Sequence, residues 1–78
     1  MYNYIYMIFE FVIEIFFKKN DGWNQTHCEY WLNYRKIKYI KSSIDHNYII
    51  YVINKVPKDT ILKTKKLKGE KGIIYTHL

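Results

Sequence analysis

The stretch that most constrains the fold is an unbroken apolar run at residues 48–53, Tyr-Ile-Ile-Tyr-Val-Ile. β-Branched and aromatic side chains fill this run, and the composition favours a strand that is buried on both faces. Turn-prone residues precede the run at positions 42–47, and Pro57 follows it. Residues 36–41 nearly alternate between basic and apolar side chains, which is typical of a strand with one face in water. The sequence from Ile37 to Lys58 therefore predicts a small β-unit with a cationic face.

A second apolar stretch covers residues 4–17, in which Glu10 and Glu14 are the only charged side chains. These two acids and Lys18 are spaced four residues apart, so they would share one face of a helix. Glu14 precedes Lys18, which is the favourable order for an ion pair on a helix. We predict an N-terminal apolar helix that packs on its own sheet or on a neighbouring protein. Two alternatives stay open for residues 4–17. One is a membrane or interfacial anchor, although the stretch is short for a bilayer and carries two acids. The other is a strand.

The segment between the two apolar stretches supports more than one interpretation. Asn20, Asp21 and Gly22 predict a turn, in which Gly22 is suited to a positive φ. Thr26 followed by Glu29 fits a helix capping box, and a helix would then continue through residues 30–34. The same residues are mostly aromatic, which favours a strand. Helix and strand therefore compete over residues 29–35, and we prefer the strand.

Turns and short strands alternate toward the C-terminus. Residues 57–59 predict a turn, residues 60–67 either a short strand or an irregular basic loop, and residues 68–72 a turn with two of the three glycines. Residues 73–76 predict a last strand. The predicted fold class is α+β, with an N-terminal apolar helix followed by a small antiparallel β-sheet of three to four strands. We expect one small domain over residues 1–78, with the helix at 1–19 and a basic β-unit at 30–78.

Charge is distributed unevenly along the chain. The formal net charge is +6, and residues 31–78 carry eleven of the thirteen basic side chains. Such a gradient predicts a polyanionic partner, and we favour RNA over an anionic membrane. We expect neighbouring proteins to contact the helix at 4–17. Since Arg35 is the only Arg, we expect contact with phosphates rather than base reading. The candidate nucleic-acid-binding residues are Arg35, Lys36, Lys38, Lys41, Lys63, Lys65, Lys66, Lys68, Lys71 and Gly72.

The composition also bears on the source of the chain. Ile, Lys, Tyr, Asn and Phe, which have A/T-rich codons, occupy 44 of the 78 positions. This bias indicates an A/T-rich genome, such as that of an organelle, an endosymbiont or a phage. Part of the lysine content then reflects codon supply, so an ordinary solvated lysine face is the competing interpretation of the basic surface.

Catalytic and metal chemistry have little support in the sequence. His27 and Cys28 are adjacent, and no third group is identifiable that would orient them as base and nucleophile. His27, Cys28, His46 and His77 lack the short-spaced ligand pair of a zinc site. We therefore expect no enzyme, no metal and no cofactor. The single Cys28 fits a reducing compartment, and the N-terminus lacks the charged region and cleavage site of a secretory signal.

Four pieces of the sequence resemble one known family. They are Ile37-Lys38-Tyr39-Ile40-Lys41, Ile50-Tyr51-Val52, Val56-Pro57-Lys58 and Lys71-Gly72-Ile73-Ile74. They look like the later part of small-subunit ribosomal protein eight of bacteria and organelles, which has a basic I-K-x-I-K strand, a strand ending in I-Y-V, a Pro-Lys connection and a Ser-Thr-Ser-Lys-Gly turn. The Ser-Thr-Ser positions fall on Lys68, Gly69 and Glu70, and the N-terminal stretch has no counterpart. The resemblance implies a structural rRNA-binding protein with Lys71 and Gly72 near RNA.

Together these features predict a structural RNA-binding protein of a ribonucleoprotein, namely a divergent small-subunit ribosomal protein of an organelle that contacts rRNA phosphates. The expected location is an organellar ribosome of a mitochondrion or plastid, or the cytoplasm of an A/T-rich bacterium or phage host. One alternative is a small phage-type protein that binds and inhibits a host protein or nucleic-acid enzyme. A second alternative is a small membrane-complex subunit anchored by residues 4–17.

Overall fold

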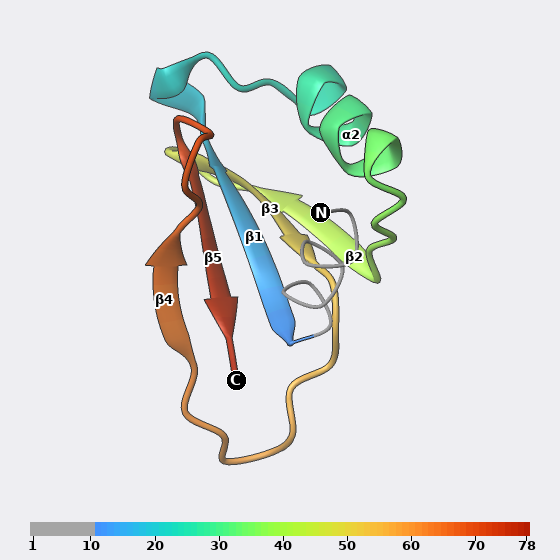
Figure 1. The fold of residues 1–78 in the computed structure, drawn as a ribbon, viewed down its shortest axis with the longest axis vertical. Coiled ribbons are helices and arrows are strands. Elements are labelled where there is room, and N and C mark those ends of the chain that lie inside the picture. Colours follow the sequence, from blue (N-terminus) through green and yellow to red (C-terminus); the bar gives the residue numbers. More distant parts are fainter. Residues whose placement is uncertain (1–10) are drawn as a thin grey trace.

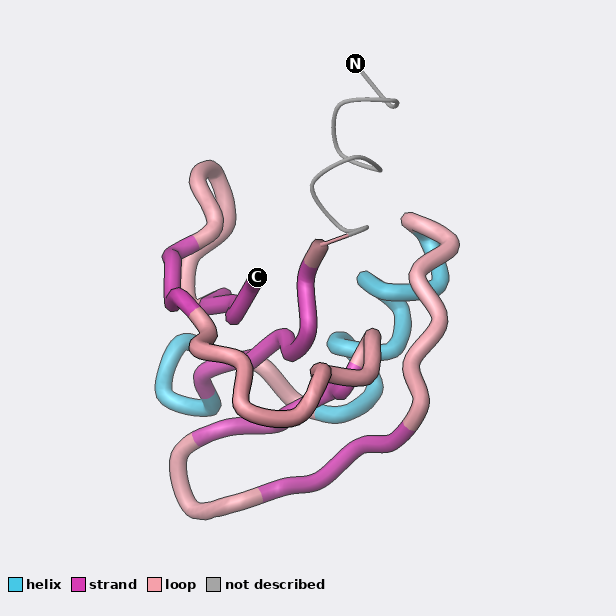
Figure 2. Tube along the Cα trace, turned by 90° about the horizontal axis from the view of Figure 1, so that it is seen from below, coloured by secondary structure: helices cyan, strands magenta, loops and turns pink. Residues whose placement is uncertain are grey.

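Strand β1, Val12–Lys18, is the central strand of a five-stranded antiparallel sheet in the computed structural model, which describes residues 11–78 (Figure 1). The strand order is β2-β3-β1-β5-β4, so β2 and β4 are the two edges. The other strands are β2 Lys41–Ile44, β3 Tyr48–Val52, β4 Lys63–Lys66 and β5 Ile73–His77. A 3-10 turn, η1 Lys19–Asp21, and the helix α2 Gln25–Tyr34 lie between β1 and β2. Figure 2 shows that the sheet is strongly twisted.

The predicted N-terminal helix at residues 4–17 is wrong for the part that the structure describes, because residues 12–18 form β1. Residues 4–10 lie outside the described residues. β1 pairs with β3 on one side and β5 on the other, so its backbone is hydrogen-bonded along both edges. A strand in that position has apolar neighbours, so its own sequence is a nearly continuous apolar run. Such a run can also be interpreted as an apolar helix. The sheet has five strands rather than the predicted three to four, because residues 12–18 add a strand where we expected a helix.

One face of the sheet forms the core together with α2. Ile15 and Phe17 of β1 lie opposite Tyr51 and Ile49 of β3, and all four side chains are buried. Ile73 of β5 lies opposite Phe17 on the other side and is also buried. The aromatic ring of Phe17 touches several other rings, with centroids 4.9 to 5.7 Å apart, in Trp23, Trp31 and Tyr51. The core is therefore built around β1.

The opposite face of the sheet carries the alternate residues of the same strands. Phe16 of β1 lies opposite Ile50 of β3 and Ile74 of β5, and these three side chains are half-buried. Glu14 is accommodated on this face because the hydroxyl of Thr76 donates to its carboxylate at 3.2 Å and accepts from its backbone N–H at 3.1 Å. β3 is thus fully buried on one face only, whereas the sequence predicted burial on both.

Helix α2 covers the core with Cys28, Trp31 and Leu32, which are spaced as neighbours on one helical face. The preferred strand at residues 29–35 is wrong, because helical spacing places three apolar side chains on the sheet at once. The helix begins two residues earlier than the predicted capping box. The side chain of Asn24 is the N-cap and accepts a hydrogen bond from the backbone N–H of His27 at 2.8 Å.

The hairpin of β2 and β3 is offset from the predicted strands. Residues 36–40 form a loop rather than a basic strand, because Lys36 adopts a positive φ of 57° as the chain leaves α2. β2 instead occupies residues 41–44, of which residues 42–44 were predicted as part of a turn. The turn itself is shorter: the carboxylate of Asp45 accepts hydrogen bonds from the backbone N–H groups of Asn47 at 2.8 Å and Tyr48 at 2.7 Å.

A connection at residues 53–62 carries the chain from β3, past β1 and β5, to the far edge strand β4 (Figure 1). The strand alternative for residues 60–67 is thus the one observed, at 63–66. The turn that follows brings Gly72 beside the end of β1, where its carbonyl accepts the N–H of Lys18 at 2.8 Å. This β4–β5 turn, residues 67–72, therefore lies against η1.

Candidate nucleic-acid interface

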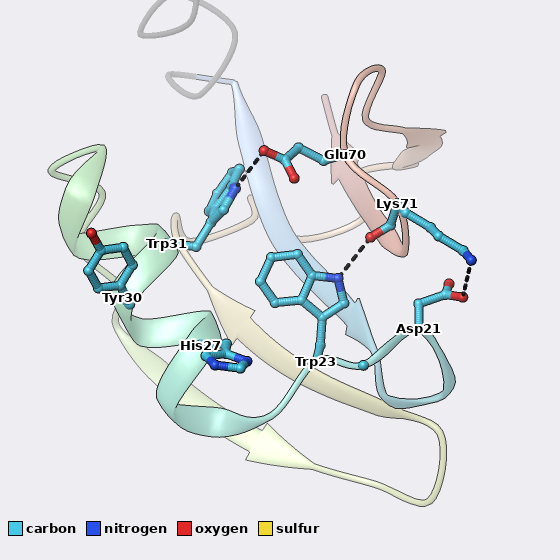
Figure 3. Close-up of a pocket in the computed structure, with 8 residues that line it drawn as sticks. Asp21, Trp23, His27, Tyr30, Trp31, Glu70 and Lys71 are labelled. Carbon is cyan, nitrogen blue, oxygen red and sulfur yellow. Dashed lines mark hydrogen bonds and ion pairs between the residues drawn. The ribbon is translucent and has the colours of Figure 1, made fainter.

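A pocket of about 440 Å³ opens between α2 and the β4–β5 turn (Figure 3). Aromatic rings dominate its lining, and Figure 3 shows them arranged around the opening. Trp23 comes from the loop before α2, and His27, Tyr30 and Trp31 come from α2 itself. The lining residues are Asp21, Gly22, Trp23, His27, Tyr30, Trp31, Glu70 and Lys71. Elements that are far apart in the sequence therefore build one aromatic site, which we call the aromatic pocket.

Both tryptophans of the pocket are held by hydrogen bonds to the β4–β5 turn. The indole N–H of Trp23 donates to the backbone carbonyl of Lys71 at 2.8 Å. The indole N–H of Trp31 donates to the carboxylate of Glu70 at 3.3 Å. Because each ring also packs on Phe17 in the core, the two indoles are fixed at both ends. The pocket is therefore preorganised by the fold.

Arg35 joins the C-terminal end of α2 to the same turn. Its guanidinium pairs with the carboxylate of Glu70 at 3.2 Å and lies over the ring of Trp31, 4.0 Å from the centroid. It also donates to the backbone carbonyl of Trp31 at 3.3 Å. The guanidinium and the carboxylate are about two-thirds or more buried, with exposed side-chain fractions of 27% and 34%. This ion pair is screened less than a fully exposed one and helps to fix the turn against the helix.

Asp21 closes the other end of the pocket. Its carboxylate lies 3.9 Å from the ammonium group of Lys71, whose side chain is 85% exposed. Its Cβ occupies the space where Gly72 would otherwise carry a side chain. Lys71 is therefore an exposed cation at the rim of the pocket, while Asp21 is packed into the wall.

Exposed aromatic side chains extend the surface along α2. Tyr30 and Tyr34 are 68% and 70% exposed and stack on each other, with centroids 6.2 Å apart and an interplanar angle of 23°. The guanidinium of Arg35 lies 5.9 Å from the ring of Tyr34. This face of the helix thus presents flat rings to solvent beside a cation.

The first half of the predicted basic set lies between the end of α2 and the edge strand β2. Arg35 is the C-cap of α2, Lys36 and Lys38 are exposed in the loop that follows, and Lys41 begins β2. Of these, the structure brings Arg35 to the aromatic pocket through its contact with Glu70. Lys41 lies on the half-buried face of the sheet, opposite Val52, and therefore points away from the core face.

The second half of the set occupies the other side of the sheet. Lys63, Lys65 and Lys66 are exposed on the edge strand β4, and Lys68 and Lys71 are exposed in the turn after it. β2 and β4 are separated by three strands, or roughly 19 Å along the sheet. The basic residues that we expected on one face are thus divided between the two edges of the sheet. The two groups approach each other where Arg35 pairs with Glu70, because Glu70 lies in the same turn as Lys68 and Lys71. Gly72 faces Asp21, and its predicted contact with RNA stays a prediction.

Cys28 is buried in the core rather than placed as a nucleophile. Its side chain is fully buried, and burial, reinforced by the nearby Glu29 carboxylate, raises the pKa of the thiol from 9.0 to about 12. Burial also raises the pKa of Tyr51, whose hydroxyl donates to Glu29 at 3.4 Å. A thiol that stays protonated at neutral pH is a poor nucleophile, and its neighbour His27 lies on the exposed side of α2.

Of the residues that line the aromatic pocket, Lys71 alone was among the predicted nucleic-acid-binding residues. His27, Tyr30 and Trp31 follow the i, i+3, i+4 spacing of one helical face, and that spacing could have identified them. Trp23 and Glu70 carry no local pattern of this kind. They reach the pocket through contacts that span 48 residues, from Trp23 to Lys71, and 35 residues, from Arg35 to Glu70. Only the folded chain brings these residues together.

Within residues 11–78, no three His, Cys, Asp or Glu side chains are grouped to hold a metal ion. The same residues include no helix that is long and apolar enough to cross a membrane. Comparison with protein-family models, with curated proteins and with solved structures finds no match to this chain. The resemblance to small-subunit ribosomal protein eight therefore stays a prediction.

Proposed function

We propose that this chain binds single-stranded or looped RNA as a structural component of a ribonucleoprotein. The observation that carries the proposal is the contact of Arg35 with Glu70, which joins the C-terminal end of α2 to the β4–β5 turn beside the aromatic pocket. Lys36 follows Arg35 in the chain, and Lys68 and Lys71 flank Glu70. Cations from both halves of the basic set therefore lie next to a group of aromatic rings.

This combination matches the chemistry of unpaired RNA. Single strands are bound by cations that follow the phosphates and by aromatic side chains on which bases stack, whereas a duplex hides its bases. The lysines of the β4–β5 turn are exposed to solvent, where phosphates can approach them, and Tyr30 offers an exposed ring on the α2 side of the pocket. A solvated lysine face without function would not need rings at its centre.

A filter-binding titration with single-stranded RNA tests the proposal. Each phosphate that is neutralised contributes a slope of about −0.7 to a plot of log affinity against log salt concentration. Contact with several phosphates should therefore weaken binding steeply between about 50 and about 200 mM salt. Binding that is absent, or that does not respond to salt, would overturn the proposal.

A pair of matched variants tests where the RNA binds. Lys68→Gln with Lys71→Gln removes two charges beside the aromatic pocket. Lys55→Gln with Lys58→Gln removes two charges from exposed lysines in the connection after β3. Only the first pair should reduce affinity and make the salt slope shallower by about one unit or more. Equal losses in both pairs would show non-specific attraction to a basic protein and would overturn the assigned interface.

At a finer level, we propose that the ribonucleoprotein is an organellar small ribosomal subunit. The support for this is the resemblance of four sequence pieces and the A/T-biased composition. The native protein should then sediment with the small subunit and be recovered in an RNA-dependent way. Recovery of a single protein partner that resists RNase would instead favour the phage-type interaction protein. For the membrane-anchored alternative, residues 12–18 are the central strand of a sheet rather than part of an anchoring helix.

A further inference from the structure

We propose that the aromatic pocket binds one unstacked nucleobase, with Lys71 at its rim reaching the attached phosphate. The inference rests on the proposed function and adds to it a defined site for a single base. The pocket volume of about 440 Å³ lies within the range of about 300 to 1,000 Å³ that is typical of small-molecule sites. Contacts to phosphate alone would not require such a space.

The internal bonds of the pocket decide what kind of ligand it accepts. The indole N–H groups of Trp23 and Trp31 already donate to the β4–β5 turn. What remains for a ligand is chiefly ring surface from Trp23, His27 and Tyr30, together with the polar atoms of the His27 ring and the Tyr30 hydroxyl. A flat ligand with a few polar atoms on its edge fits this lining, because ring faces bind flat groups by stacking.

The charges of the pocket argue against a cationic ligand. Aromatic cages that bind quaternary ammonium groups attract them with ring faces and gain from nearby negative charge. Here Glu70 is paired with Arg35, and Asp21 lies near Lys71, so both carboxylates of the lining already face cations. Arg35 also covers one face of Trp31. A neutral planar base with a phosphate beyond the rim is favoured over an ammonium group.

Tryptophan fluorescence gives a direct readout, because the chain has two Trp residues and both line the pocket. We would titrate the full chain with uridine 5′-monophosphate and adenosine 5′-monophosphate, exciting at the red edge of tryptophan absorption. Saturable quenching or a spectral shift supports a base in the pocket. Choline chloride and inorganic phosphate serve as probes of the two alternatives. A saturable response to choline, or a response to phosphate equal to that of the nucleotides, would overturn the inference.

Two variants with a matched control locate the response. His27→Ala and Tyr30→Leu remove ring surface from the exposed side of α2 and should weaken nucleotide affinity about ten-fold, since stacking on one ring has about this effect. His46→Ala removes the same kind of ring from the exposed β2–β3 turn and should leave affinity unchanged. Circular dichroism verifies that all three variants are folded. Unchanged affinity in both pocket variants would overturn the inference.

The two proposals fail in different ways. Salt-dependent binding of RNA without any change in tryptophan emission would overturn the base site and leave the RNA-binding function intact. Saturable nucleotide quenching in a chain that does not bind RNA would overturn the proposed function and support the pocket as a site for a free nucleotide.

Discussion

The Cβ of Asp21 lies 2.7 Å from the position that a Cβ on Gly72 would occupy. Gly72 also has a φ of 79°, so its conformation and its surroundings both exclude a side chain. This contact is what lets the turn after β4 lie against η1 at the end of β1. The wall of the aromatic pocket that contains Asp21 and Lys71 depends on it.

Replacing Gly72 by Ala should therefore destabilise the fold more than the same change at Gly69. Gly69 has a similar φ of 84°, but nothing lies within 4 Å of its added Cβ. Gly69→Ala should cost about 1 kcal/mol for the positive φ alone, and Gly72→Ala about 2 to 4 kcal/mol because the Asp21 wall must move as well. Urea denaturation of the two variants measures the difference. Equal costs would contradict the packing of Asp21 against Gly72.

Phe17 should be among the most sensitive positions in the described part of the chain. Its side chain is fully buried in β1 and contacts three aromatic rings, so Phe17→Ala should lower the free energy of unfolding by about 3 to 5 kcal/mol. Phe11→Ala is the matched control, because Phe11 is 56% exposed and should change stability by about 0.5 kcal/mol or less. A large cost at Phe11 and a small one at Phe17 would contradict the assigned strand.

Stability should fall at alkaline pH because of Cys28 and Tyr51. The folded state raises the pKa of Cys28 from 9.0 to about 12 through burial, so the unfolded chain loses its proton first. The stabilisation is fully present below pH 9.0 and is lost as pH rises toward 12, with a slope of about 1.4 kcal/mol per pH unit for each such group. Urea denaturation as a function of pH measures the slope. In Cys28→Ala it should be shallower, and an unchanged slope would contradict the role of the thiol.

Asp45 should stabilise the β2–β3 turn in a pH-dependent way. Backbone hydrogen bonds from Tyr48 and Asn47 lower its pKa below the ordinary value of 3.8, so the carboxylate favours the folded state above that pH. This contribution is lost as pH falls through the lower pKa of the folded state. Asp45→Ala should therefore reduce the Tm at neutral pH, and the difference from the unsubstituted protein should shrink below about pH 3.8. A difference that is constant with pH would contradict the prediction.

The sequence predicted correctly those elements whose local composition is typical of the structure that they form. The apolar run at residues 48–53 became β3, the glycine-containing segment at 68–72 became a turn, and residues 73–76 became most of β5. In the two strands, β-branched or aromatic residues fill a short run with turn residues beside it, and in the turn two glycines lie within five residues. These features depend on near neighbours in the chain, so a single sequence is sufficient to predict them.

The same criterion, applied to residues 12–17, would have predicted a strand. Apart from Glu14, these residues are β-branched or aromatic, but the spacing of Glu10, Glu14 and Lys18 favoured a helix. The structure uses Glu14 differently, as a partner of Thr76 across 62 residues of sequence. A polar side chain that is satisfied by a distant hydroxyl leaves no local pattern, and so tertiary contact overrode the helical spacing.

The candidate site was predictable only in part. The lysines could be identified from the sequence, but their separation onto β2 and β4 follows from strand order, which depends on long-range pairing. The preferred strand at residues 29–35 also concealed the shared helical face of His27, Tyr30 and Trp31. Without that helix, no aromatic pocket could be inferred.

The positions of β2 and β4 at the two borders of the sheet have a consequence for solubility. A border strand leaves half of its backbone hydrogen-bonding groups open to another chain, and lysines there oppose edge-to-edge aggregation by mutual repulsion. Every residue of both strands is exposed, and β4 carries three lysines in four positions. Neutralising those lysines, by acetylation or by excess polyphosphate, should therefore promote precipitation through the sheet borders, which light scattering would detect.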